Sequence, residues 1–118
     1  MKILVTGAAG FIGYFTAKIL TEKGYTVVGL DNINDYYDVN LKYGRLKALG
    51  IAKADAELFN NVCQSNTTSF SFVRLNLEDR ENLPKLFEAE QFDIVCNLAA
   101  QAGVRYSLEN PDTYVDSN

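Results

Sequence analysis

The apolar residues of this chain follow two alternating patterns. Short runs such as Ile3-Leu4-Val5 are typical of buried strands. They are followed by stretches in which apolar residues recur every three or four positions, which is the spacing of one face of a helix. The pattern therefore predicts strands at 2–6, 25–30, 70–75 and 92–98, and helices at 11–23, 39–49 and 80–89.

Local signals support the three helices. Gly24 and Gly50 follow the first two helices, where glycine commonly ends a helix. Asp79 precedes the third helix and is suited to cap it. An apolar stripe marks one face of each helix: Ile12, Phe15, Ile19 and Leu20 in the first, Val39, Tyr43, Leu46 and Leu49 in the second, and Leu83, Leu86 and Phe87 in the third.

Two segments are less regular. Residues 51–69 are mostly polar and indicate a surface loop, with a short helical turn at 54–59. Pro111 suits the first turn of a further helix, which we expect to run to the chain end at Asn118.

Three glycines connect the first strand to the first helix. Gly7, Gly10 and Gly13 are spaced three residues apart, and a strand, a glycine turn and a helix in this order form the phosphate-binding corner of a dinucleotide-binding fold. Gly7 allows a sharp turn, Gly10 leaves room for a pyrophosphate, and Gly13 lets the helix lie close to the strand. The free N–H groups of the helix then face the anion. The alternative is an ordinary tight turn that binds nothing.

The second strand leads into Asp31, which lies at about the expected distance of ~20 residues from the glycine turn for a ribose-binding acid. Its carboxylate could accept hydrogen bonds from both hydroxyls of the adenosine ribose, and its charge would repel a 2′-phosphate. No Arg or Lys follows immediately. We therefore expect NAD to be preferred over NADP, unless Asp31 is simply a solvated acid at a strand end.

Strands that alternate with helices predict an α/β fold with a doubly wound parallel sheet of the Rossmann type. The glycine turn favours the strand order 3-2-1-4, with a ligand cleft where the first and fourth strands end side by side. The later strands of such a sheet are absent, so the fourth strand should be an apolar edge with Ile94, Val95 and Leu98 poorly covered. We expect an N-terminal part of a longer protein that forms a homodimer or self-associates through this edge.

Composition narrows the function further. The 118 residues suffice for one domain, here taken as residues 1–118. The net charge of -4, without a basic block, argues against nucleic-acid binding. No apolar run approaches the ~20 residues of a membrane span, and no signal peptide is recognisable, so we expect a cytoplasmic protein. The chain has no histidine, which removes histidine-based catalysis and most zinc sites, and Cys63 and Cys96 are expected to be reduced.

The segment Thr6-Gly7-Ala8-Ala9-Gly10-Phe11-Ile12-Gly13 resembles the extended short-chain dehydrogenase/reductase superfamily, and Asn97-Leu98-Ala99-Ala100 is similar to its cofactor-lining segment after the fourth strand. Two longer stretches, 31–38 together with Leu41-Lys42, and 99–111, resemble UDP-glucuronate 4-epimerases. The resemblance implies that NAD takes a hydride from C4 of the sugar and returns it to the opposite face.

The resemblance also implies roles for individual residues. It implies a cofactor site of Gly7, Gly10, Phe11, Ile12, Gly13, Asp31, Asn32, Asn76, Leu77, Leu98, Ala99 and Ala100, with Gln101 and Arg105 facing a nucleotide-sugar substrate. Asn76 and Asn97 depart from the superfamily, in which Asp and His are frequent at these positions. Arg105 could bind a sugar carboxylate or a diphosphate, or it could pair with Glu109 on the surface.

No catalytic residue is expected in this chain, because the superfamily's Tyr-x-x-x-Lys pair lies on a helix beyond Asn118. Tyr14-Lys18 and Tyr43-Lys47 have that spacing, but they lie on the first two helices and are expected to be coincidental. Two other functions stay open: a dehydratase or decarboxylase of nucleotide sugars with the same fold, and a non-catalytic NAD-binding module. A phosphate-binding NTPase is disfavoured because no Lys-Ser or Lys-Thr follows the glycines.

Overall fold

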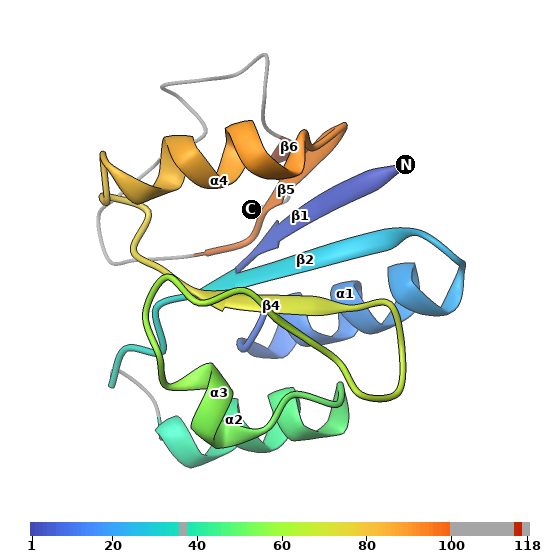
Figure 1. Ribbon diagram of the computed structural model, residues 1–118. Coiled ribbons are helices and arrows are strands. Elements are labelled where there is room, and N and C mark those ends of the chain that lie inside the picture. Colours follow the sequence, from blue (N-terminus) through green and yellow to red (C-terminus); the bar gives the residue numbers. More distant parts are fainter. Residues whose placement is uncertain (36–37, 100–114, 117–118) are drawn as a thin grey trace.

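A sheet with helices on both faces organises the chain, as Figure 1 shows for the computed structural model, which describes residues 1–35, 38–99 and 115–116. In these residues the strand order is β3-β4-β2-β1-β5-β6. The strands are β1 (Lys2–Thr6), β2 (Thr26–Asp31), β3 (Cys63–Gln64), β4 (Ser71–Arg74), β5 (Ile94–Asn97) and β6 (Val115–Asp116), and the helices are α1 (Phe11–Glu22), α2 (Val39–Ala48), α3 (Lys53–Ala56) and α4 (Asn82–Glu90).

The four strands predicted from the sequence form the centre of the sheet. The order β4-β2-β1-β5 is the expected 3-2-1-4, and all three of its pairings are parallel. The doubly wound α/β fold is therefore confirmed. At one edge β3 pairs with β4 in the antiparallel direction, so the sheet is mixed rather than wholly parallel. This short strand lies inside the segment that we expected to be a loop.

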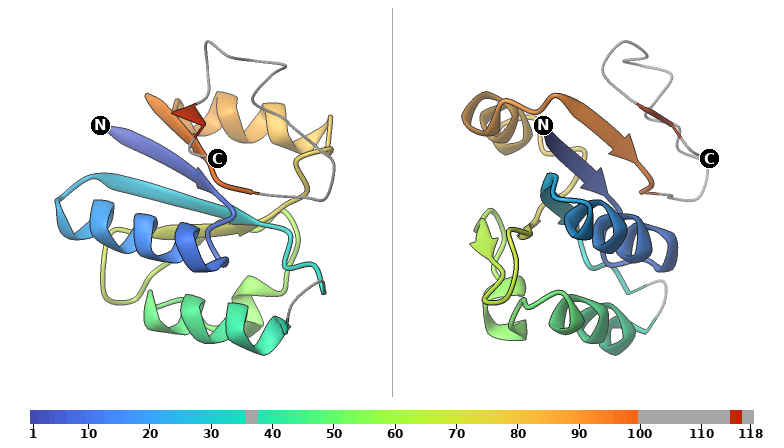
Figure 2. Two further views of the ribbon diagram at one scale, coloured as in Figure 1. Left: turned by 180° about the vertical axis from the view of Figure 1, so that it is seen from behind. Right: turned by 90° about the vertical axis from the view of Figure 1, so that its right-hand side faces the viewer.

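Each face of the sheet has its own apolar layer, because side chains along a strand alternate between the faces. Phe70 and Phe72 are fully buried in the layer under α1 and α2, whereas Val73 and Leu75 belong to the layer under α4. Figures 1 and 2 show α1 and α2 on one side of the sheet and α4 on the other. The alternation in this strand was readable from the sequence.

The packed face of α1 differs from the apolar stripe in its sequence. Gly13 and Ala17 are its buried residues, whereas Ile12, Phe15 and Ile19 are 65%, 43% and 49% exposed. Small residues face the sheet because α1 lies too close to the glycine turn for larger ones. The helix itself was predicted correctly, and Leu20 of the predicted stripe packs against the core, whereas Ile12, Phe15 and Ile19 lie outside it.

The edge beside β5 is better covered than expected. Cys96 and Asn97 pair in parallel with β6, and Val95 is only 4% exposed because it packs in the layer under α4. The expectation of an uncovered Val95 and a wholly unpaired edge is therefore wrong. The helix expected from Pro111 to Asn118 is also wrong at 115–116, which form β6, and the rest of that segment lies outside the described residues.

The helix ends follow the sequence signals. Asp79 Oδ1 accepts hydrogen bonds from the backbone N–H groups of Glu81 and Asn82, at 3.1 and 2.8 Å, so it caps the start of α4 as expected. These bonds favour the ionised carboxylate and lower the pKa of Asp79. The turn predicted at 54–59 is the short helix α3, slightly earlier in the chain. Among the described residues, none of the helices is long and apolar enough to cross a membrane.

Candidate functional site

The carboxyl ends of the parallel strands meet at one edge of the sheet. In this register Thr6 of β1 lies between Leu30 of β2 and Asn97 of β5, and Asp31 pairs with Arg74 of β4. The segments that follow these strands contain the expected cofactor residues within the described chain: Gly7, Gly10, Phe11, Ile12, Gly13, Asp31, Asn32, Asn76, Leu77, Leu98 and Ala99. Ala100, Gln101 and Arg105 lie outside the described residues, as does the pair of Arg105 with Glu109.

Gly7 brings the turn after β1 against the end of β5. Its φ of 71° lies in the left-handed region, and a Cβ there would lie 2.9 Å from the backbone nitrogen of Ala99 and the carbonyl of Leu98. A Cβ on Gly13 would overlap the carbonyl of Gly7, which is how closely α1 approaches the turn. The glycine turn and the segment after β5 are thus adjacent, as a cleft at the switch point requires.

The N-terminus of α1 opens at the same edge. Gly10 is its N-cap residue and provides no side-chain cap, and the first turn of the helix contains no acid. Phe11 and Ile12 are 66% and 65% exposed. An uncapped helix of this length has N–H groups and a partial positive charge at its start, so it favours an anion such as a phosphate.

Asn97 connects the two central strands. The hydroxyl of Thr6 donates to Asn97 Oδ1 at 2.5 Å and accepts from the backbone N–H of Ala99 at 3.2 Å. Thr6 and Asn97 are 1% and 3% exposed, so these are buried bonds that hold the ends of β1 and β5 together. The Asn97 amide thus has a structural function here.

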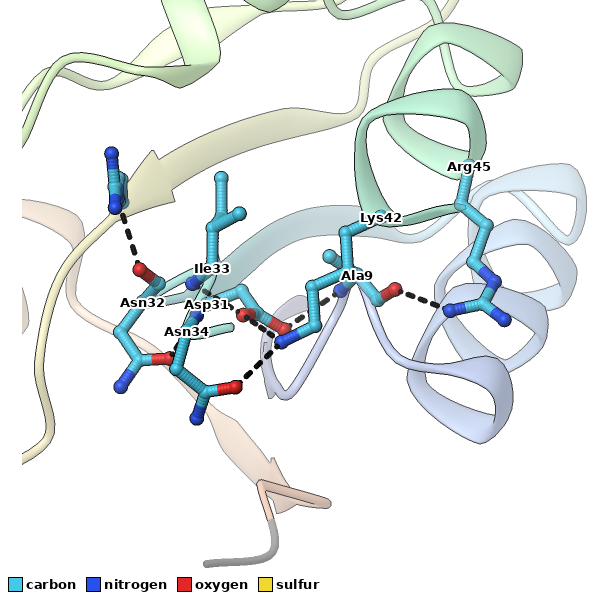
Figure 3. A network of polar contacts seen from close by, with 8 residues as sticks. Ala9, Asp31, Asn32, Ile33, Asn34, Lys42 and Arg45 are labelled. Atoms are coloured by element: carbon cyan, nitrogen blue, oxygen red, sulfur yellow. Dashed lines mark hydrogen bonds and ion pairs between the residues drawn. The ribbon is translucent and has the colours of Figure 1, made fainter. Parts of the chain in front are cut away.

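Asp31 ends β2 beside the glycine turn, and its carboxylate is held by backbone donors. The N–H of Ala9 donates to Oδ2 at 3.1 Å, and the N–H of Ile33 donates to Oδ1 at 2.7 Å (Figure 3). Ile33 has a φ of 52°, which for a β-branched residue costs roughly 1–3 kcal/mol. Asp31 is only 6% exposed, so it is not a solvated acid at a strand end.

Two cations of α2, which were not predicted from the sequence, contact Asp31 and the neighbouring Ala9. Lys42 Nζ binds Asp31 Oδ1 at 3.4 Å and donates to Asn34 Oδ1 at 3.2 Å, and Arg45 donates to the carbonyl of Ala9 at 3.0 Å (Figure 3). Lys42 is 7% exposed. The signal in the sequence was a lysine at helical spacing within the buried apolar stripe of α2.

The other expected contacts are half-buried and lie near this centre. The carbonyl of Asn32 accepts a hydrogen bond from Arg74 Nε at 2.9 Å, which fixes the backbone after Asp31. Asn76 follows β4, and its carbonyl accepts from the N–H of Asp79 at 3.1 Å. Leu77 packs against the layer under α4. Asn32 and Asn76 thus lie in the segments that directly follow β2 and β4.

The two cysteines and the tyrosines of the two Tyr-x-x-x-Lys pairs have contacts that are typical of packing. Cys63 and Cys96 are free thiols, as expected, and burial raises the pKa of both. Tyr14 packs edge-on against the ring of Phe15, and Lys53 Nζ lies 5.1 Å from the centre of the Tyr43 ring. In the described part of the chain no three His, Cys, Asp or Glu side chains gather into a potential metal site.

Comparison with known proteins gives consistent results. The family described as GDP-mannose 4,6 dehydratase matches residues 4–118. The chain is 50% identical over 118 residues to protein CapI of Staphylococcus aureus, covering all of this chain and 30% of that protein. It is 43% identical over 115 residues to a UDP-glucuronate 4-epimerase of Thermodesulfobacterium geofontis, covering 98% of this chain and 31% of the relative.

A solved structure has the same fold. The chain matches a crystal structure of a UDP-glucuronic acid 4-epimerase mutant from Bacillus cereus, in complex with NAD and a fluorinated UDP-glucuronic acid, at a TM-score of 0.64 and 35% identity. The match covers 91% of this chain and 29% of that enzyme. The chain thus spans about 30% of the length of the curated relatives that it matches.

Proposed function

We propose that this chain, which belongs to the NAD-dependent epimerase/dehydratase family, forms the NAD-binding portion of a UDP-glucuronate 4-epimerase. The family membership follows from the match of residues 4–118 to the family described as GDP-mannose 4,6 dehydratase. The parent protein would interconvert UDP-glucuronate and UDP-galacturonate. The observation that carries the proposal is the position of Asp31, a buried carboxylate beside the uncapped N-terminus of α1. The named relatives support the sugar: those at 42–43% identity include several UDP-glucuronate 4-epimerases.

The described residues fit a dinucleotide. The backbone from Gly7 to Gly13 has no Cβ at three positions, and the start of α1 offers N–H groups to a pyrophosphate. Asp31 would accept from the adenosine ribose, and Asn32, Asn76 and Leu77 would surround the adenine. Phe11 and Ile12 contribute their N–H groups to the pyrophosphate end.

The opposite end of the cofactor would lie along the segment after β5. Leu98 and Ala99 lie against Gly7, and Ala100 continues that segment. When bound, NAD would supply the hydride acceptor and donor for C4 of the sugar. This chain's own contribution is to bind and orient it, while Gln101 and Arg105 would contact the substrate. The catalytic tyrosine and lysine are proposed to lie in the rest of the parent protein.

A second function has one observation in its favour. The family match carries the description of a dehydratase, and the cofactor portion of such an enzyme would require the same Asp31 and glycine turn. A non-catalytic NAD-binding module would also retain them. Cofactor binding can therefore be measured with this chain, whereas the reaction has to be measured in a complete enzyme.

A chimera provides that test. This chain would replace the matching N-terminal segment of the Bacillus cereus epimerase, and the conversion of UDP-glucuronate to UDP-galacturonate would be measured with UDP-glucose as the control substrate. We expect a folded chimera that binds NAD and converts UDP-glucuronate, and a matched chimera with Gly10→Val that folds but is inactive. A folded chimera that binds no NAD would contradict the proposal.

A further inference from the structure

Two cations of α2 contact the Asp31 carboxylate and the neighbouring Ala9, and the proposed function does not use them. Lys42 and Arg45 are about one helical turn apart on α2, so both extend from the same face of the helix, Lys42 to Asp31 and Arg45 to Ala9. Lys42 binds the carboxylate itself, and Arg45 binds the carbonyl of Ala9, whose N–H donates to the other carboxylate oxygen. Figure 3 shows Lys42 directed at Asp31 and Asn34, and Arg45 directed at the carbonyl of Ala9.

The carboxylate has little capacity left for a ligand. A carboxylate has about four acceptor positions. The N–H of Ile33 and Lys42 Nζ share Oδ1, and the N–H of Ala9 uses Oδ2. One position therefore remains for a ribose hydroxyl, unless Lys42 withdraws. Lys42 therefore competes with the ribose for Asp31, which we expected to accept hydrogen bonds from both ribose hydroxyls.

Lys42 is also held in place by features other than its contact with Asp31. Its side chain is 9% exposed, and its ammonium donates to Asn34 Oδ1 at 3.2 Å. A buried stem and a second acceptor keep the charge at this position if the acid is replaced. This distinguishes Lys42 from an exposed lysine that would turn toward solvent.

We infer that Lys42 is a latent 2′-phosphate ligand which Asp31 neutralises, so that the Asp31–Lys42 pair, and not Asp31 alone, sets the preference between NAD and NADP. The inference rests on the proposed NAD site. Dinucleotide-binding folds that accept a 2′-phosphate place a basic residue near it. Here the paired charges of Asp31 and Lys42 cancel. Replacing Asp31 by an amide leaves the +1 charge of Lys42 opposite a phosphate of about -2.

The substitution Asp31→Asn therefore should not only weaken NAD but also strengthen NADP. Asparagine has the size of aspartate and retains one oxygen that can accept from the N–H of Ile33 or Ala9. We expect NAD to bind several-fold more weakly and NADP to bind about tenfold more tightly than to the native chain, the effect of one charge-assisted hydrogen bond. The preference should then be inverted.

A double-mutant cycle assigns the gain to Lys42. Calorimetric titrations with NAD and with NADP would compare the native chain, Asp31→Asn, and Asp31→Asn combined with Lys42→Met. The matched control combines Asp31→Asn with Lys47→Met, which removes the same charge from an exposed position of α2. We expect the NADP gain to disappear with Lys42→Met and to persist with Lys47→Met. Added salt should reduce the gain, because it is electrostatic.

A single variant makes the test independent of whether Asp31→Asn folds. Lys42→Met in the native background should weaken the binding of NADP more than that of NAD. The dissociation constant for NADP divided by that for NAD should therefore rise. An unchanged ratio, or an NADP gain that survives the loss of Lys42, would overturn the inference while leaving NAD binding to the native chain intact. A folded native chain that binds no NAD would instead overturn the proposed function and this inference with it.

Discussion

Replacing Gly10 and Gly13 one at a time should separate cofactor binding from folding. A Cβ on Gly13 would overlap the carbonyl oxygen of Gly7 and lie 2.6 Å from its carbonyl carbon. Both are backbone atoms, so no side-chain rotation relieves the contact, and the cost should lie at the upper end of the overpacking range, about 3 kcal/mol. Alanine returns about 1 kcal/mol of helix propensity. We expect Gly13→Ala to lower the free energy of unfolding by about 2 kcal/mol.

Gly10 has different surroundings. Its φ of -77° and ψ of 170° are extended backbone, and a Cβ there would meet only the Gly7 oxygen, at 3.2 Å. A shift of a few tenths of an ångström accommodates it, so Gly10→Ala and Gly10→Val should change stability by about 1 kcal/mol or less. Either side chain would occupy the space expected for the pyrophosphate. Losing two charge-assisted bonds of about 1.5–3 kcal/mol each predicts NAD affinity lower by ~10²–10⁴-fold.

The assay combines urea unfolding, followed by circular dichroism, with calorimetric titration of NAD. Gly13→Ala should shift the unfolding midpoint, whereas Gly10→Val should leave the spectrum nearly unchanged and abolish measurable binding. Unchanged NAD affinity in Gly10→Val would show that the turn serves the fold alone. Unchanged stability in Gly13→Ala would refute the close approach of α1 to the turn.

Three further predictions follow from particular residues. The isolated chain should not interconvert UDP-glucuronate and UDP-galacturonate, because loss of general acid–base groups alone typically costs ~10²–10⁴-fold in rate; turnover by the purified chain would mean that Tyr14-Lys18 or Tyr43-Lys47 is catalytic. The depressed pKa of Asp79 means that its ionised form stabilises the fold above its ordinary pKa of 3.8 and that this contribution is lost as the pH falls through its lower folded value. Asp79→Ala should therefore lower the unfolding midpoint at pH 7, and the difference from the native chain should shrink in strong acid. Self-association through the edge beside β5 stays a prediction, and sedimentation at several concentrations measures it; a concentration-independent monomer would contradict it.

Much of the central sheet was predictable because each strand and helix carries its own periodic signal. The four strands from 2–6 to 92–98, their order and the Asp79 cap were predicted from local patterns. Pairings that join distant segments were not. The two-residue strand β3 carries no strand pattern, and it forms because Cys63 and Gln64 lie beside Phe72 and Ser71 of β4.

The candidate site was also predictable only in part from the sequence. The position of Asp31 beside the glycine turn could be predicted, since both follow neighbouring parallel strands. Its pairing with Lys42 could not, because the distance between a strand end and a helix face depends on how α2 packs. The exposure of Ile12 and Phe15 could not be predicted either, since periodicity identifies an apolar stripe but not the small residues that face the sheet.

We expect this chain to bind NAD through Asp31 and the glycine turn. Calorimetric titration of the native chain with NAD and with NADP, under the same salt and pH, tests it most directly. We expect a saturable NAD isotherm and an affinity for NADP that is weaker by about tenfold or more, because Asp31 opposes a 2′-phosphate and also occupies Lys42, the cation that would bind one. Equal affinities for the two cofactors, or no binding of NAD by the folded chain, would contradict it.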